Sequence, residues 1–452
     1  MQAAIYDPAI RHLVISLGAA YEAFEAAPYD SRQRLEKTYL ESTEFALQQC
    51  NRSIRLLAAP SGVGPGGHQE PAEKVYRLLT ASILFIHFAS MRGHLAEAIQ
   101  HVRSAVKVLQ DFENRAEEHS PSPGHSYPIP LSHLRALLAS SYGQLRTMIN
   151  LTALEAGSQD LLACPDIKPA TVFTSVADAH SYVEKLYNAQ LAFHQDAEIN
   201  PPTTPERVDE IVARHSTLCR ALISSESALE VFAASLTEQD QQQQQQQNQH
   251  RKSSSPESGS DSDSHLNPKP DAHTNTDTHK AILVLRVYHI LISVRSRLNA
   301  ALRPEQRESA FDEFESDLDN MLHHCEEILS GDQTQATCFS GLGCVMPLHT
   351  ITARCRNPRI RRRALNLLLG TSRREGLWDS QLTGRIAAQT MEIEEELVRA
   401  AQLQGENREA AAKKRLREVR LELAGERGAL IRFLTVEDWE TGREGIQKTF
   451  QW

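Results

Sequence analysis

Apolar residues recur at helical spacing along most of the chain. In IRHLVISLGAAYEAF, one stripe consists of Ile10, Leu13, Leu17 and Tyr21. The same period predicts helices over residues 131–154, 176–197 and 205–236, and helices resume with KAILVLRVYHILISVRSRLNAAL from residue 280. The pattern therefore predicts an all-α fold, either a multi-helical bundle or a solenoid-like array of helix pairs.

Residues 237–279 interrupt this pattern. They contain almost no apolar side chain and are rich in Gln, Ser and Asp. Such a segment cannot bury enough surface to offset the entropy of ordering it, so we expect a long disordered loop. Ser255 precedes a proline, and Ser258 and Ser260 each have an aspartate three residues on, so all three are candidate phosphorylation sites, with an inert spacer as the alternative.

Near the C-terminus the period changes from helical to two. Val419, Leu421 and Leu423 alternate with polar residues, and Gly425 and Gly428 follow, which predicts a small β-hairpin. We therefore divide the chain into a first helical half at 1–236, a linker at 237–279, a second helical half at 280–405, and a tail at 406–452.

The tail begins with a basic helix end. Lys413, Lys414, Arg415 and Arg417 form a cluster that we expect to be exposed between the helix and the hairpin. Such a run is typical of a nuclear import signal. A solvated helix end is the equally weighted alternative.

Composition narrows the class of protein. The chain has 452 residues, 23% charged and 40% hydrophobic, with a net charge of −10, which argues against a nucleic-acid binder as a whole. No apolar run approaches the roughly 18 residues of a membrane span. Seven scattered cysteines favour a reduced intracellular compartment.

Motifs of enzyme chemistry are weak or missing. GVGPGG, at 62–67, matches G-x-G-x-x-G, but a helix rather than a strand precedes it and Pro65 interrupts it, so we interpret it as a loop. In HHCEE, at 323–327, neighbouring side chains point to different helix faces, so we expect no metal site there. The sequence therefore predicts no catalytic residue, no cofactor and no enzymatic activity.

The stretch from 355 to 380 holds a dense set of arginines, namely Arg356, Arg359, Arg361, Arg362, Arg363, Arg373 and Arg374. Asn357 and Pro358 predict a helix start and Gly370 a stop. An apolar stripe of Ile360, Ala364, Leu367 and Leu368 would face inward, leaving the arginines outward or paired with acids. Direct contact with DNA, nuclear import and partner binding are the alternatives.

Trp378 follows this helix in EGLWDS. We expect Gly376 to form the turn, Asp379 or Ser380 to cap a second helix, and the indole to fill the corner between the two helices.

PLHTITARCRNPRIRRRALNLLLGTSRREGLWDS, from 347 to 380 and followed by an Ile/Glu-rich helix, resembles the C-terminal signature of the fungal-specific transcription factor region. Helical pieces of the N-terminal half, such as DPAIRHLVISLGAAYEAF, are similar to that region as well. Below, "the signature" means residues 347–380. The positions that carry the resemblance are Pro347, Cys355, Arg356, Pro358, Arg361, Arg362, Glu375, Gly376, Trp378 and Asp379.

The resemblance implies an all-helical regulatory region of the kind that accompanies a six-cysteine zinc cluster, yet this chain has no C-x2-C-x6-C. We therefore expect the regulatory and interaction region of a fungal transcription regulator of metabolic or secondary-metabolite genes, located in the nucleus, or otherwise in the cytoplasm. Its partners would be the transcription machinery or a second copy of the chain, with DNA contacted only indirectly and no membrane involved. The alternatives are a helical scaffold or adaptor protein, and a gene model that lacks the exon for a zinc cluster.

Overall fold

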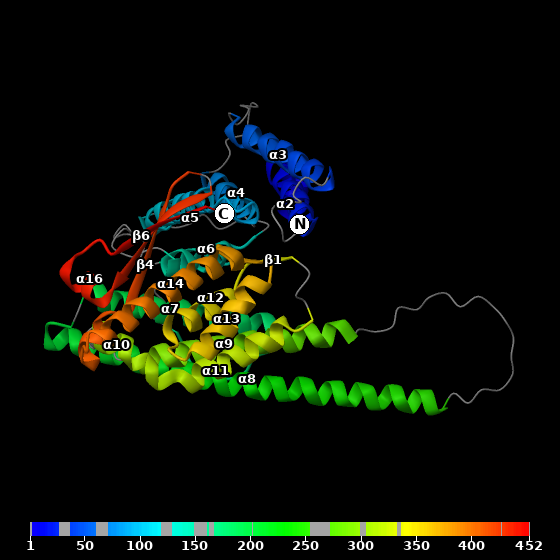
Figure 1. Ribbon diagram of the computed structural model, residues 1–452. Helices are drawn as coiled ribbons and strands as arrows, with labels where there is room; N and C mark the ends of the chain where they lie inside the picture. The colour runs from blue at the N-terminus through cyan, green and yellow to red at the C-terminus, as the bar shows by residue number, and fades with distance from the viewer. Residues whose placement is uncertain are drawn as a thin grey trace.

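The structure is a computed structural model. It describes residues 2–26, 37–59, 71–118, 129–148, 161, 167–200, 202–253, 272–298, 304–331, 336–425 and 427–451. The described part is predominantly helical, with two small sheets (Figure 1). The prediction of an all-α fold with a small C-terminal β element is confirmed.

The first half of the chain consists of helices. In order they are α1 Gln2–Tyr6, α2 Pro8–Ala26, α3 Lys37–Ala58, α4 Pro71–Met91, α5 Leu95–Glu118, α6 Leu131–Met148, α7 Val176–Ile199 and α8 Pro205–Ser253. The predicted starts at 131, 176 and 205 are therefore confirmed.

Helices and short strands alternate in the second half. The helices are α9 Ala272–Arg297, α10 Pro304–Ala310, the 3₁₀ turn η3 Phe311–Phe314, α11 Glu315–Leu329, α12 Val345–Arg354, α13 Pro358–Gly370, α14 Ser380–Leu403, α15 Arg408–Lys413 and α16 Val436–Thr441. The strands are β1 Thr337–Phe339, β2 Arg373–Glu375, β3 Trp378–Asp379, β4 Leu416–Leu423, β5 Gly428–Thr435 and β6 Ile446–Gln451.

The structure differs from the prediction at both ends of the 237–279 segment. Helix α8 continues through the glutamine tract to Ser253, and α9 already begins at Ala272. Glutamine has a high helix propensity, so a glutamine run can extend a helix without an apolar stripe. Residues 254–271, which include the three candidate phosphorylation sites Ser255, Ser258 and Ser260, lie outside the described residues, as does the loop at 62–67.

The predicted hairpin is present as β4 and β5. Val419 pairs with Phe433 and Leu421 with Ile431, and Gly425, with φ +72°, lies in the turn. A third strand, β6, pairs antiparallel with β5 and was not predicted, because most of its residues are exposed and give no apolar alternation.

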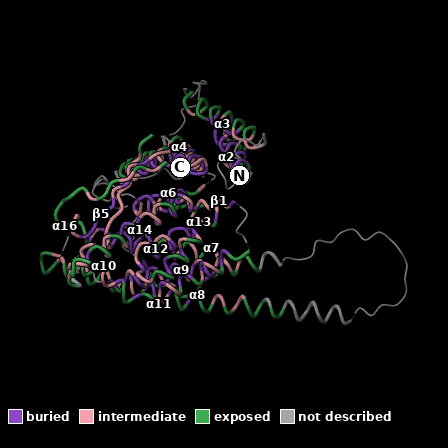
Figure 2. Tube along the Cα trace, viewed as in Figure 1, coloured by how far each residue is buried: buried purple, intermediate pink, exposed green. Residues whose placement is uncertain are grey.

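The core draws on both sides of the 237–279 segment. The larger apolar cluster joins α7 and α8 to α9, α11, α12 and α13, and α8 and α9 lie side by side (Figure 1). A second cluster joins α4, α5 and α6. The tube in Figure 2 shows buried residues concentrated where these helices face one another.

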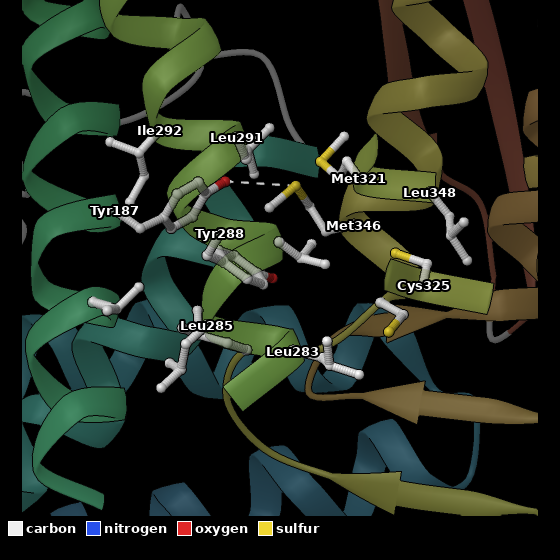
Figure 3. Close-up of a cluster of buried hydrophobic side chains, with 14 of the residues drawn as sticks. Tyr187, Leu283, Leu285, Tyr288, Leu291, Ile292, Met321, Cys325, Met346 and Leu348 are labelled. Atoms are coloured by element: carbon white, nitrogen blue, oxygen red, sulfur yellow. Dashed lines mark hydrogen bonds between the residues drawn. The ribbon is translucent and has the colours of Figure 1, made fainter. Parts of the chain in front are cut away.

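Two tyrosines lie at the centre of the larger cluster (Figure 3). The rings of Tyr187 and Tyr288 meet edge to face at 5.3 Å, and the Tyr187 hydroxyl donates to Met346 Sδ at 3.7 Å. Burial raises the pKa of both phenols, so both remain protonated packing groups near neutral pH.

Candidate functional site

The signature begins in α12 and α13. The Asn357 side chain accepts from the Arg359 amide at 3.0 Å, and Pro358 occupies the first turn of α13. Pro347 is buried in the first turn of α12. The predicted start and stop of α13 are confirmed, and so is an inward stripe that includes Ile360, Ala364 and Leu368.

We expected Arg361 to point outward from α13 or to pair with an acid. It pairs with an acid, and it does so inside the fold, where it is 4% exposed. Its Nη1 donates to Glu394 Oε2 at 2.9 Å, and its Nε donates to the Thr352 carbonyl at 2.9 Å. A buried carboxylate on α14 therefore keeps this arginine inside the fold.

Glu394 is the centre of a charged cluster. Arg356 Nη1 also donates to Glu394 Oε2, at 3.0 Å, and Arg356 Nη2 lies 3.6 Å from Glu308 Oε2 on α10. Arg354 pairs with Glu308 as well. Both glutamates are 2% exposed, so α10, α12, α13 and α14 are joined by ion pairs inside the molecule.

The outer face of α13 carries the remaining arginines. Arg363 pairs with Asp319 at 3.0 Å and with Glu326 at 2.7 Å, both on α11. Arg362, with its side chain 60% exposed, reaches Glu395 at 3.5 Å. Carboxylates compensate the charges of Arg362 and Arg363 and leave Arg359 as an exposed arginine of this helix. One such group is less than the concentrated positive charge that phosphate contacts require.

Glu375 is a buried carboxylate at the end of β2. It accepts from the amides of Cys344 at 3.1 Å and Val345 at 2.7 Å, at the start of α12, and from Arg373 Nε at 3.2 Å. A carboxylate at a helix N-terminus satisfies amides that have no partner within the helix and interacts favourably with the helix dipole.

Gly376 makes the turn between β2 and β3. Its φ is +61°, and a Cβ there would lie 2.2 Å from Gln144 Oε1. That same oxygen accepts from the Leu377 amide at 2.8 Å. Ser90 of α4 donates to the Gly376 carbonyl. Only glycine fits this close approach to α6.

Leu377 and Trp378 enter different parts of the core. Leu377 packs in the α4–α6 cluster, and Trp378, 7% exposed, packs in the larger cluster, 5.3 Å from the His349 ring. The predicted burial of Trp378 is confirmed, and the aromatic ring that it meets belongs to α12, a helix that the prediction did not include. The segment from Gly376 to Trp378 is therefore a joint between the first and second halves of the chain.

Asp379, near the end of the signature, is the N-cap of α14. It accepts from the Leu382 amide at 3.0 Å and from Arg374 Nε at 2.9 Å. Of the two capping residues that we considered, Asp379 is the N-cap, while the Ser380 hydroxyl donates to the Thr371 carbonyl at 2.7 Å.

Cys325, Cys344 and Cys355, in or near the signature, are buried, and Cys338 of β1 is partly buried. Burial raises the pKa of the Cys355 thiol. A hydrogen bond with Cys344, together with burial, raises the pKa of Cys325 well above its ordinary value. A thiol in this state is a poor nucleophile. In the described part of the chain, no three His, Cys, Asp or Glu side chains gather as a metal site would require.

The basic run of the tail extends from the end of α15 into β4, and the prediction that it is exposed is wrong for its arginines. Arg415 pairs with Asp312 at 2.8 Å, and Arg417 lies over the Trp439 ring at 4.0 Å with 8% of its side chain exposed. Lys413 and Lys414 pair with Glu440 and Glu437 of α16. An import receptor would have to break these contacts, and the import signal remains a prediction.

The sequence did not predict which residues bind the side chains and backbone of the signature. Glu308, Glu394 and Gln144 lie far along the chain from the groups they hold, and no local motif marks them.

Comparison with known proteins identifies no relative. No family model, curated protein or solved structure matches the chain. Among the described residues, no helix combines the length and apolar character needed to cross a bilayer.

Proposed function

We propose that the chain is the regulatory and interaction region of a fungal-type transcription regulator. It acts through protein partners in the nucleus and contacts DNA only indirectly. The observation that carries the proposal is the role of the signature in the fold, because Gly376 and Trp378 join helices of both halves and Glu375 holds the start of α12. If the chain has the fold of the regulatory region that it resembles, the residues that carry the resemblance should lie at positions that hold that fold together, as they do.

The charge distribution supports indirect rather than direct action on DNA. Glu394 holds Arg356 and Arg361, and the acids of α11 hold Arg363. A protein that binds DNA through such a run would leave its guanidinium groups open to phosphate.

A tethering experiment tests the proposal. The full chain is fused to a heterologous DNA-binding domain and placed upstream of a reporter gene in a filamentous fungus. We expect reporter expression to change by at least about tenfold relative to the DNA-binding domain alone, and the untethered chain to have no effect. A fusion that is folded and nuclear, yet leaves expression at the level of the DNA-binding domain alone, would contradict the proposal and favour a scaffold protein.

A further inference from the structure

A cleft with a volume of about 420 Å³ lies between the N-terminal helices and the end of the signature. Its walls come from α2, α3, the turn between α4 and α5, β2, the start of α14 and the turn between β4 and β5. Small-molecule sites commonly have volumes of roughly 300–1,000 Å³ and lie where separate elements meet. The cleft has a suitable size and position for such a ligand.

Five arginines line this cleft, in a chain whose net charge is −10. They come from four separate parts of the chain and are Arg92, Arg373, Arg374, Arg385 and Arg427. Among the described residues, Asp379 is the one carboxylate that lines it. The arginines are therefore brought together by the tertiary fold.

Two of these arginines are neutralised. Arg374 Nε pairs with Asp379 at 2.9 Å, and Arg373 Nε pairs with Glu375 at 3.2 Å, behind the wall of the cleft. These pairs fix both guanidinium groups in place. Asp379 and Glu375 are thereby occupied and do not compensate the positive charge of Arg92 or Arg385.

Arg92 and Arg385 have no carboxylate within ion-pair distance in the described part of the chain. The Arg92 guanidinium lies 5.4 Å from the centre of the Phe88 ring, and Arg385 Nη1 donates to the Gln451 carbonyl at 3.4 Å. Arg427 Nη2 donates to the backbone carbonyl of Arg92 at 2.9 Å, which brings a further cation to the same wall. Clustered like charges repel, and a bound anion would relieve that repulsion.

The position of Arg374 is built into the backbone. Gly93 has a φ of +75°, and a Cβ there would lie 3.2 Å from Arg374 Nη2. Arg374 also donates to the Met91 carbonyl, and its guanidinium lies 4.9 Å from the centre of the Phe24 ring. The turn between α4 and α5 thus accepts the arginine in a fixed place, as a preorganised binding site requires.

The rest of the lining is mixed. Ala20, Phe24, Met91 and Leu382 supply apolar surface, and Tyr39 and Thr43 of α3 supply hydroxyl groups. Guanidinium groups bind carboxylates and phosphates with paired hydrogen bonds. This lining suits anionic groups carried on a short carbon frame.

We propose that this cleft binds a small organic polyanion with two or more carboxylate or phosphate groups. The ligand contacts Arg92, Arg385 and Arg427 with its charged groups and packs its carbon frame against Phe24 and Met91. This site goes beyond the proposed function and does not depend on it, because binding can be measured on the purified chain alone.

Isothermal titration calorimetry on the full chain tests the site with two probes, citrate for polycarboxylates and fructose 1,6-bisphosphate for phosphate esters. We expect saturable binding of one ligand per chain for at least one probe, and the preferred probe identifies the anionic group. The double variant Arg92→Gln/Arg385→Gln should weaken that binding by about tenfold or more, because charge-assisted hydrogen bonds are lost.

Arg359→Gln is the matched control. Arg359 is an exposed arginine of α13 that does not line the cleft, and its loss should leave the affinity unchanged. Arg427→Gln is a second test variant and should also weaken binding. Thermal unfolding followed by circular dichroism checks that each variant is folded.

Three results would overturn the proposal. The first is that neither probe gives saturable heat. The second is that wild type and the double variant bind the probe with equal affinity. The third is that a short poly-glutamate peptide binds more tightly than the probes and displaces them. The last result would assign the cleft to an acidic segment of a protein instead of a small molecule.

Discussion

Glu394 shows what a single buried carboxylate does in this fold. It accepts from Arg356 and Arg361 with one oxygen and from the Leu416 amide, at 3.1 Å, with the other. Burial lowers the pKa of Arg356, and the neighbouring Glu394 and Glu308 oppose that effect. The carboxylate compensates charges that would otherwise be costly to keep away from water.

Glu394→Gln should therefore destabilise the protein strongly. It leaves two largely buried guanidinium groups without their shared charge, and breaking such a pair costs about 3–5 kcal/mol. Glu395→Gln, next to it but partly exposed and paired with the exposed Arg362 at 3.5 Å, should cost less than about 1 kcal/mol. Urea unfolding of both variants measures the difference, and equal losses would show that the cluster does not stabilise the fold.

Trp378→Ala tests the joint between the two halves. The indole is 7% exposed in the larger cluster, and emptying a large aromatic site costs about 3–5 kcal/mol. Arg362→Ala, on the solvent side of α13, should cost under about 1 kcal/mol. Guanidinium unfolding compares the two variants. A near-neutral Trp378→Ala would mean that the side chain serves partner binding and not packing.

At the scale of elements, locally encoded features could be predicted and non-local ones could not. The caps at Asn357 and Asp379 could be predicted because a cap bonds to amides two or three residues away. The burial of Arg361 could not, because it depends on Glu394 in another helix. The arginine-lined cleft was also missed, since Arg92 and Arg385 meet only after α4 and α14 have packed.

The α8 extension is an element-scale exception. Its glutamines favour helix by intrinsic propensity, whereas our prediction relied on the apolar period. Replacing residues 245–271 with a flexible Gly/Ser linker should shift the thermal midpoint by less than about 2 °C. Among the described side chains, the last buried one of α8 is Leu229 and the first of α9 is Ile282, so the core stays intact. A fall in the midpoint, measured by calorimetry, of roughly 5 °C or more would show that the segment packs on the core.

At the scale of the whole molecule, the buried His289 and the partly buried His349 make the stability of the fold depend on pH. Burial lowers the pKa of His289 to about 4, where its ring Nε2 lies 2.8 Å from the Ser225 hydroxyl. Burial, with a smaller contribution from Arg354, lowers the pKa of His349 to about 4 beside Trp378. The His289 ring lies between α8 and α9, and the His349 ring lies beside Trp378. Protonation would therefore disturb the packing at both places.

The sign of the effect follows from the two states. In the unfolded chain a histidine has a pKa of about 6.5, so below that pH the unfolded state binds a proton that the folded state does not. The free energy of unfolding therefore falls as the pH drops from about 6.5 to about 4. At pH 5, each of the two histidines lowers it by about 2 kcal/mol.

His289→Gln keeps a polar group that can reach Ser225 but cannot take up a proton. We expect the loss of stability between pH 7 and pH 5, measured by urea unfolding at both pH values, to be smaller by about 2 kcal/mol than in wild type. His323→Gln, which replaces an exposed histidine of α11, should leave that loss unchanged. Comparing each variant with itself at the two pH values removes any cost that the substitution has at neutral pH. If His289→Gln loses as much stability as wild type on acidification, His289 is protonated in the folded protein, and the hydrogen bond to Ser225, instead of burial, sets its charge.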